Sequence, residues 1–320
     1  MPHRWEPTAP WPTDLVRPVA VDPLGVAGPT RREAAGPYWV RTSTARYVPA
    51  DTDRTRAEQR VLEQAERLPP AGAVTGWAAC RVHGAAFFDG LADDGRTRLP
   101  VPLAVGPSGR LRGDPGATAV HHVLLPSDRA HLHGIATVVP VRAAYDAVRL
   151  AAGPRGAVVA LDMALAAGLT TLEQLAAYAD QQPRDRRTVL RAAGFATPHS
   201  RSPRESRLRL AWLLDARLPA PLVNPTIRDR AGRFLGIADL LDPVAGLVAE
   251  YDGADHRTSR RQAADLGRED RLRRVGLEVA RFSGPDLADR ALVVRRLLEA
   301  RARCRFDGDL DRAWVAIAAS

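Results

Sequence analysis

The sequence contains no lysine, so each of its 46 basic residues is an arginine. The formal net charge of +9 attracts polyanions such as DNA, and the planar guanidinium group suits bidentate contacts to phosphate. A bias in genomic base composition would also replace lysine by arginine throughout a chain. Because the positive charge is spread along the sequence, the composition permits nucleic-acid binding without establishing it.

Cysteine and long hydrophobic runs are also scarce. Cys80 and Cys304 lie far apart without a metal-binding spacing, which argues against a zinc site and against a disulfide framework. No apolar run approaches the roughly 18 residues that a membrane helix needs, and the segment MPHRWEPTAPWP lacks the apolar core of a signal peptide. We therefore expect a cytoplasmic protein without membrane association.

Changes in composition divide the 320 residues into four segments, and the mixture of strand and helix patterns predicts an α/β fold. Residues 1–35 are rich in proline and glycine and should form an extended or poorly ordered arm. Residues 36–190 are predicted to form a mixed α/β domain. A polar linker precedes a second domain at residues 200–305, and residues 306–320 are expected to be a tail.

The first domain shows four successive patterns. The segment PYWVRTSTARYVPA predicts two short strands around a turn, and residues 55–67 predict a helix that a proline pair ends. Residues 73–139 predict several strands joined by loops. Residues 140–180 predict a helical hairpin or small bundle, with a break between helices at Gly168 and the two threonines after it.

The second domain begins with a helix start and a strand pair. In Ser202-Pro203-Arg204-Glu205 the serine fits the N-cap and the glutamate the third helical position, so Glu205 has a structural explanation as part of a capping box. The segments RFLGIADLL and AGLVAEYDG, separated by Asp242-Pro243, predict a β-hairpin.

Three carboxylates of this hairpin are predicted to converge. The two-residue period of a strand places Glu250 and Asp252 on one face, and the short turn brings Asp239 opposite Glu250. Like charges among apolar strand residues repel unless a cation neutralises them, and oxygen ligands select Mg²⁺ or Mn²⁺, which can promote hydrolysis of a phosphodiester. The alternative is that the acids lie on the solvated face of an edge strand and oppose aggregation.

Histidine and arginine residues follow these acids. His256, after the tight turn in EYDGADH, is able to act as a base, an acid or a phosphate contact, or to be a solvated surface residue. The segment from Ser259 to Arg274 predicts a helix. Its Arg268 and Arg271, with Arg281 of the strand LEVARFS, are candidate nucleic-acid contacts, while the alternative for the helix is a solvated, salt-bridged surface.

The order of these motifs resembles a known family. SPRES, ADLLDP, VAEYDGADH, REDRLRRVG and LEVARFS, within residues 202–303, resemble the very-short-patch-repair-like endonuclease branch of the PD-(D/E)XK superfamily, a domain family of largely unassigned function. The resemblance implies a restriction-endonuclease-like mixed sheet flanked by helices. It also implies that the last strand is followed by a helix from Asp289 to Arg303.

The resemblance also assigns roles by position. Asp239 matches the invariant metal ligand, Glu250 the second acid and Glu205 the helix-borne acid, while the backbone carbonyl of Tyr251 would complete the metal shell. Asp252 stands where the parent pattern has lysine. In this branch the E-x-D-G-x-x-H form is usual, so the role of the lysine would fall to His256.

The N-terminal half resembles, more weakly, the antitoxin-like proteins of abortive-infection systems, through PYWVRTSTARYVPA, AVTGWAACRVHG and VVPVRAAYDAVRLA followed by VALDMALAAG. Such relatives begin with a winged helix-turn-helix, of which only the wing-like ribbon is recognisable. Trp77 and His83 are expected to be core residues.

Two functions from different classes follow. The first is a Mg²⁺-dependent (or Mn²⁺-dependent) endonuclease that hydrolyses nucleic-acid phosphodiesters, DNA above all, in defence or DNA repair and with a toxin–antitoxin or defence partner. The second is a non-catalytic DNA-binding or antitoxin-like transcriptional regulator that keeps the nuclease fold as a scaffold, because a fold does not dictate a function. A purely structural or protein-interaction role is the third alternative.

Overall fold

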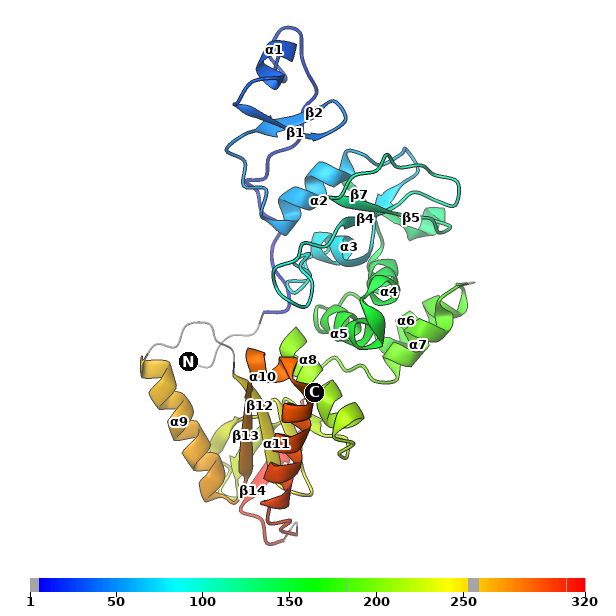
Figure 1. Cartoon of the computed structure of the whole chain (residues 1–320). Helices are drawn as coiled ribbons and strands as arrows, with labels where there is room; N and C mark the ends of the chain where they lie inside the picture. Colours follow the sequence, from blue (N-terminus) through cyan, green and yellow to red (C-terminus); the bar gives the residue numbers. More distant parts are fainter. Residues whose placement is uncertain (1–5, 183, 253–258, 309, 320) are drawn as a thin grey trace. The chain divides into compact units, whose positions relative to one another are not determined.

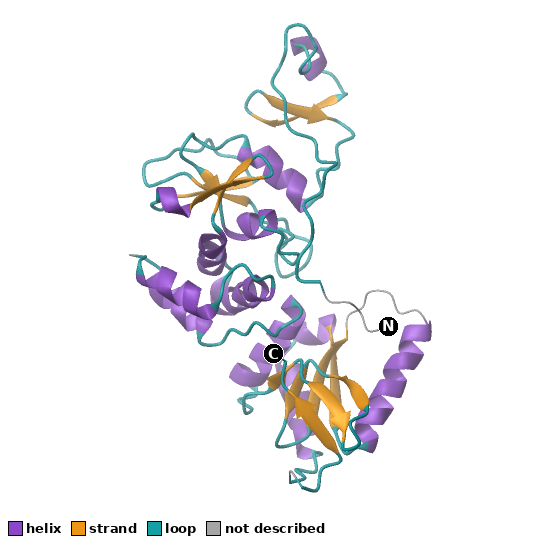
Figure 2. Ribbon diagram, turned by 180° about the vertical axis from the view of Figure 1, so that it is seen from behind, coloured by secondary structure: helices purple, strands orange, loops and turns teal. Residues whose placement is uncertain are grey.

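The computed structural model describes residues 6–182, 184–252, 259–308 and 310–319, and in the helix that begins at Ser259 it describes side chains from Gly267 onward. The chain divides into two compact units, unit 1 from Met1 to Ala196 and unit 2 from Thr197 to Ser320. The division falls in the polar stretch ATPHSRSPRES. Helices and strands alternate in both units, which confirms the predicted α/β class (Figures 1 and 2).

Unit 1 contains a two-stranded ribbon, a five-stranded sheet and a group of helices. Its elements are α1 (Arg31–Ala34), β1 (Trp39–Ser43), β2 (Arg46–Pro49), α2 (Ala57–Ala65), β3 (Ala73–Val74), α3 (Gly76–Val82), β4 (Val101–Ala104), β5 (Ala117–Val120), the 3-10 turn η1 (Pro126–Asp128), β6 (Arg129–Leu132), β7 (Ile135–Val138), α4 (Pro140–Leu150), α5 (Gly153–Ala166), α6 (Leu172–Asp180) and α7 (Arg186–Ala193). The sheet order is β5-β4-β3-β7-β6. Thr171 is the N-cap of α6, which confirms the predicted break between helices.

The N-terminal arm of unit 1 is extended and bound to the rest of the unit. Thr8 forms a bridge with Ala85, and Val19 forms one with Tyr47 of β2. Trp11 packs against the hydrophobic core of the unit. The arm thus has no core of its own, but it contributes to that of the domain.

Unit 2 combines a mixed sheet with a smaller antiparallel one. Its elements are α8 (Pro203–Leu210), the π-helical turn η2 (Ala211–Asp215), β8 (Leu222–Val223), β9 (Thr226–Asp229), β10 (Phe234–Ile237), β11 (Leu240–Asp242), β12 (Leu247–Asp252), α9 (Ser259–Arg274), β13 (Glu278–Ser283), α10 (Gly284–Ala288), α11 (Arg290–Ala302) and β14 (Trp314–Ile317). The larger sheet has the order β13-β12-β11-β8, with β12 and β13 parallel, and the smaller has the order β10-β9-β14.

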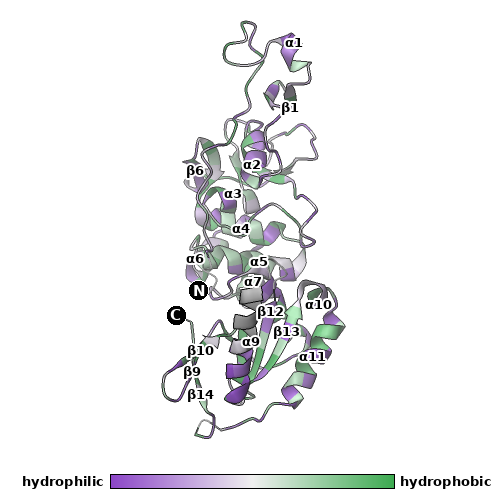
Figure 3. Cartoon of the chain, turned by 90° about the vertical axis from the view of Figure 1, so that its left-hand side faces the viewer, coloured by the Kyte–Doolittle hydropathy of each residue, from purple (hydrophilic) through white to green (hydrophobic). Residues whose placement is uncertain are grey.

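Helices cover both faces of the larger sheet, because its strands are apolar on both sides. One core cluster joins α8, η2 and α11 to the sheet through Leu208, Trp212 and Leu297, and a second joins α9 to the opposite face through Leu272 and Val248. In Figure 1, α9 and α11 lie on opposite sides of β12 and β13, and Figure 3 shows how hydrophobic residues gather on these strands.

The structure corrects two predictions for unit 2. The segment RFLGIADLL forms two strands in different sheets, because the chain bends at Asp239; only β11 pairs with β12 in the predicted hairpin, while β10 pairs with β9. Residues 306–320 are not merely a tail, since β14 pairs with β9 and Trp314 is buried. That pairing joins distant segments of the chain, so no local pattern predicts it.

No helix in the described part of the chain is both long and apolar enough to cross a membrane.

Candidate functional site

Asp239 lies where three strands of unit 2 meet. The antiparallel register pairs Leu240 of β11 with Ala249 of β12, so Asp239, one residue before Leu240, comes opposite Glu250, one residue after Ala249, as the sequence predicts. Its carboxylate accepts a hydrogen bond of 2.7 Å from the backbone N–H of Tyr251, and its carbonyl accepts one of 3.0 Å from the N–H of Asn224. These backbone contacts fix the carboxylate at the end of the sheet.

Glu205 approaches this point from the first turn of α8. Ser202 is the N-cap of the helix, as predicted, and its hydroxyl accepts a hydrogen bond of 3.2 Å from the N–H of Glu205. The Glu205 carboxylate accepts a bond of 2.9 Å from the N–H of Arg201 and one of 2.8 Å from the side-chain amide of Asn224. The buried Glu205 therefore helps to cap the helix and also joins it to the strand segment that carries Asn224.

Glu250 is buried on the face of β12 that α9 covers. Arg268 of α9 donates two parallel hydrogen bonds to its carboxylate, Nη1 to Oε1 at 2.6 Å and Nη2 to Oε2 at 2.7 Å. The Nε atom of Arg281 lies 3.7 Å from Oε2 of Glu250 and 3.0 Å from a carboxylate oxygen of Glu269, which also pairs with Arg273 at 2.8 Å. Arg268 and Arg281 thus hold carboxylates in this structure.

Burial raises the pKa of all three acids, and at Asp239 the charges of the other two add to this effect. Desolvation is the main reason why the pKa of Asp239 lies well above its ordinary value, and the negative charges of Glu205 and Glu250 raise it further. Burial also raises the pKa of Glu205, although hydrogen bonds from Asn224, Arg201 and Ser202 favour its charged form. The pKa of Glu250 is raised by burial despite the opposing effect of Arg268 and Arg281. The site is therefore rich in negative charge that only partly finds a cation.

The oxygen donors of Asp239 and Glu250 are of the kind that Mg²⁺ and Mn²⁺ prefer. Within the described residues, no group of three or more Asp, Glu, His or Cys side chains stands ready to hold a metal ion. In this arrangement both oxygens of Glu250 are bound to Arg268.

The other predicted site residues take different positions. The side chain of Tyr251 packs against the α8 and α11 side of the sheet, and Asp252 is half-buried at the end of β12. Arg271 is exposed on α9. His256 lies outside the described residues.

Two contributors were missed by the sequence analysis. Asn224 has a positive φ of 49° and links Glu205 with the backbone of residue 239. Glu269 ties Arg281 and Arg273 together. For Asn224 a sequence signal exists, because asparagine is enriched in left-handed turns. For Glu269, a single glutamate in an arginine-rich helix, the sequence contains no such signal.

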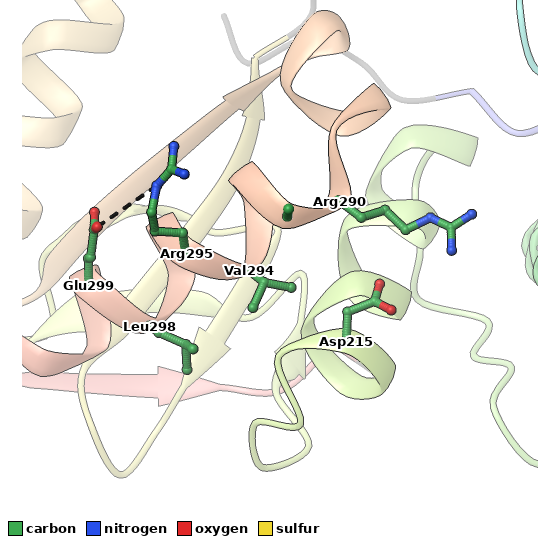
Figure 4. Close-up of a pocket in the computed structure, with 7 residues that line it drawn as sticks. Asp215, Arg290, Val294, Arg295, Leu298 and Glu299 are labelled. Atoms are coloured by element: carbon green, nitrogen blue, oxygen red, sulfur yellow. Dashed lines mark ion pairs between the residues drawn. The ribbon is translucent and has the colours of Figure 1, made fainter.

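Of two hollows on the surface of unit 2, one lies beside the neighbours of Glu250 and the other lies between η2 and α11. A cleft of about 270 Å³ is lined by residues of α9, β13 and α11 that include Glu269 and Arg281, the neighbours of Glu250. A shallower, mainly apolar depression is formed by η2 and α11, where Asp215, Arg290, Val294 and Leu298 face the same space (Figure 4). None of the three acids lines either hollow.

In comparisons with known proteins, no family model, no curated protein and no solved structure matches the chain.

Proposed function

We propose that unit 2 is a metal-dependent nuclease-like domain that hydrolyses phosphodiesters of nucleic acids, DNA above all. The observation that supports this proposal best is the convergence of Glu205 of α8, Asp239 between β10 and β11, and Glu250 of β12, where burial and the charges of the two glutamates raise the pKa of Asp239. Acids that repel one another in a protein interior cost stability, and sites that bind cations are a common reason for such an arrangement.

In this proposal Asp239 and Glu250 hold a Mg²⁺ or Mn²⁺ ion, and the carbonyl of Tyr251 adds a further oxygen. Such an ion, when bound, makes water a better nucleophile and stabilises charge on the phosphodiester. Glu205, whose pKa is raised by burial, assists proton transfer together with His256.

Arg271 is the exposed arginine that would contact phosphate, while Arg268 and Arg281 act through Glu250. Asp252 replaces the lysine of the parent pattern and has no donor to offer in its place. A cytoplasmic location and a role in defence or DNA repair, with unit 1 as an antitoxin-like module for a partner, complete the proposal.

A second candidate is a non-catalytic DNA-binding regulator that keeps the nuclease fold. It is favoured by one contact, the bidentate ion pair between Arg268 and Glu250, which satisfies the second acid without any metal ion.

Cleavage of labelled single- and double-stranded DNA and RNA with Mg²⁺ or Mn²⁺ separates the two candidates. We expect the wild type to cleave at least one substrate, and Asp239→Ala and Glu250→Ala to lose the activity. Asp270→Ala, which removes an exposed acid of α9, is the control and should remain active. Binding of DNA without cleavage by the wild type under all these conditions would favour the regulator.

A further inference from the structure

Arg268 is built into unit 2 as a clamp on Glu250. Besides its two bonds to the carboxylate, its Nη1 donates a bond of 2.9 Å to the carbonyl of Ile237, which anchors the guanidinium between β10 and β12. A Cβ atom added to Gly236 would lie 3.1 Å from Cδ and 3.2 Å from Cγ of Arg268. A side chain larger than that of glycine would thus crowd the path along which the arginine reaches the acid.

The clamp leaves the charges of the site unbalanced. Among the described residues no arginine forms an ion pair with Asp239, and the attraction of Arg268 is the weakest of the influences named for its pKa. Glu205 is satisfied by neutral amide and hydroxyl donors and by one backbone N–H. Arg268, with Arg281 at 3.7 Å, therefore neutralises Glu250, while Asp239 has no such ion pair among the described residues.

A metal ion and the clamp need the same oxygens. Divalent cations bind carboxylate oxygens directly, at about 2.0–2.6 Å, and a guanidinium in bidentate contact occupies both oxygens of Glu250. The two cations would also repel each other. The side chain of Arg268 is 26% exposed, so an outward rotation can bring its charge into solvent.

We propose that Arg268 is a positioning residue that takes the place of the metal ion at Glu250 in the metal-free protein and is displaced when the ion binds. This inference rests on the proposed function. It follows that Arg268 keeps the side chain of Glu250 buried when no metal ion is bound. It also follows that Arg268 weakens metal binding, because it competes with the ion for the carboxylate oxygens of Glu250. The pair sets a threshold of metal concentration below which the site stays closed.

Titration of the full chain with Mn²⁺ tests this, with binding followed by calorimetry and, independently, by the signal of free Mn²⁺ in electron paramagnetic resonance. We expect Arg268→Gln to bind Mn²⁺ at least about tenfold more tightly than the wild type, because coupling between close charge pairs commonly exceeds the free energy of a tenfold change. Arg274→Gln removes an arginine of the same helix whose side chain is 78% exposed, and it should leave the affinity within about twofold, since an exposed charge is screened by solvent.

Thermal melting in chelator supplies a second readout. The Arg268→Gln variant should melt below the wild type without metal and gain more from added Mn²⁺. Arg268→Lys keeps the charge but cannot donate the two parallel bonds, so its affinity should lie between the two, and it serves if the glutamine variant fails to fold.

Unchanged or weaker Mn²⁺ binding by both Arg268 variants would overturn the inference. If the wild type still cleaves nucleic acid in a metal-dependent way, that result leaves the proposed function in place and makes the ion pair a permanent structural contact. If no variant binds Mn²⁺ and the wild type does not cleave, both the inference and the proposed function fail.

Discussion

Asp239→Asn should stabilise the metal-free protein while it removes metal binding. Asparagine has nearly the shape of aspartate, and its side-chain oxygen can still accept the hydrogen bond that the N–H of Tyr251 donates to Asp239. What the substitution removes is a negative charge in a desolvated place beside Glu205 and Glu250.

The size of the effect follows from two opposing contributions. Like unit charges a few ångströms apart interact by about 2 to 4 kcal/mol at an effective dielectric constant near 20. The hydrogen bond from Tyr251 becomes weaker by roughly 1 kcal/mol when its acceptor loses the charge. The free energy of unfolding should therefore rise by about 1 to 3 kcal/mol, which corresponds to an increase of about 4 °C or more in the melting temperature.

Denaturant and thermal unfolding in chelator at pH 8 measure this, with Asp242→Asn as the matched control. Asp242 is buried at the far end of β11, but its oxygens accept bonds from the N–H groups of Val244 and Ala245 and pair with Arg301 at 3.1 Å. Its neutralisation should cost about 1 to 3 kcal/mol.

The pH dependence of the stability difference between Asp239→Asn and the wild type tests the direction of this effect. A carboxyl group with a raised pKa destabilises the folded state above that pKa, and the penalty disappears as the pH falls through it. The advantage of Asp239→Asn should therefore shrink as the pH is lowered from 8. If Asp239→Asn destabilises the protein as much as Asp242→Asn does, the carboxylate is not under repulsion and the reasoning behind the site is wrong.

Three further predictions concern the two cores. Asp146→Ala should lower the free energy of unfolding by about 3 to 5 kcal/mol in denaturant titrations, because it leaves the buried Arg142 and Arg149 without their shared carboxylate, at 2.8 and 2.6 Å; a loss below 1 kcal/mol would contradict this. Burial lowers the pKa of His83, so its neutral form is favoured on folding and stability should fall as the pH drops below about 6.5; the fall should be smaller in His83→Gln. Trp212→Ala should cost about 3 to 5 kcal/mol, since the indole is fully buried, and a smaller loss would mean that the core of unit 2 closes over the cavity.

Local patterns predict most elements of this fold and few of its long-range pairings. The alternation of AGLVAEYDG predicts β12, and the serine and proline at positions 202 and 203 predict the start of α8, because caps and strand periods act over a few residues. The pairing of β14 with β9 depends on packing of Trp314 beneath the smaller sheet. Nothing within WVAI specifies that partner.

The sequence predicts the acids of the candidate site but not the arginines that pair with them. The spacing of Asp239 and Glu250 follows from strand register, so the sequence places them together. Which arginine reaches them cannot be read from a helix in which Arg268, Arg271 and Arg273 all look alike. The choice of Arg268 depends on the gap left by Gly236 and on the crossing of α9 over β10, both of which are properties of the assembled unit.

The absence of lysine acquires a structural meaning in both units. Arg268 uses two nitrogens on Glu250 and shares one of them with a backbone carbonyl, and Arg142 bonds to Asp128, Asp146 and Tyr178 from a nearly inaccessible position. A lysine ammonium would offer three donors at one point and could not span such partners in a plane. A compositional bias toward arginine therefore supplies residues that bridge several buried acceptors at once, and the same property lets Arg268 hold both oxygens of Glu250 and the carbonyl of Ile237.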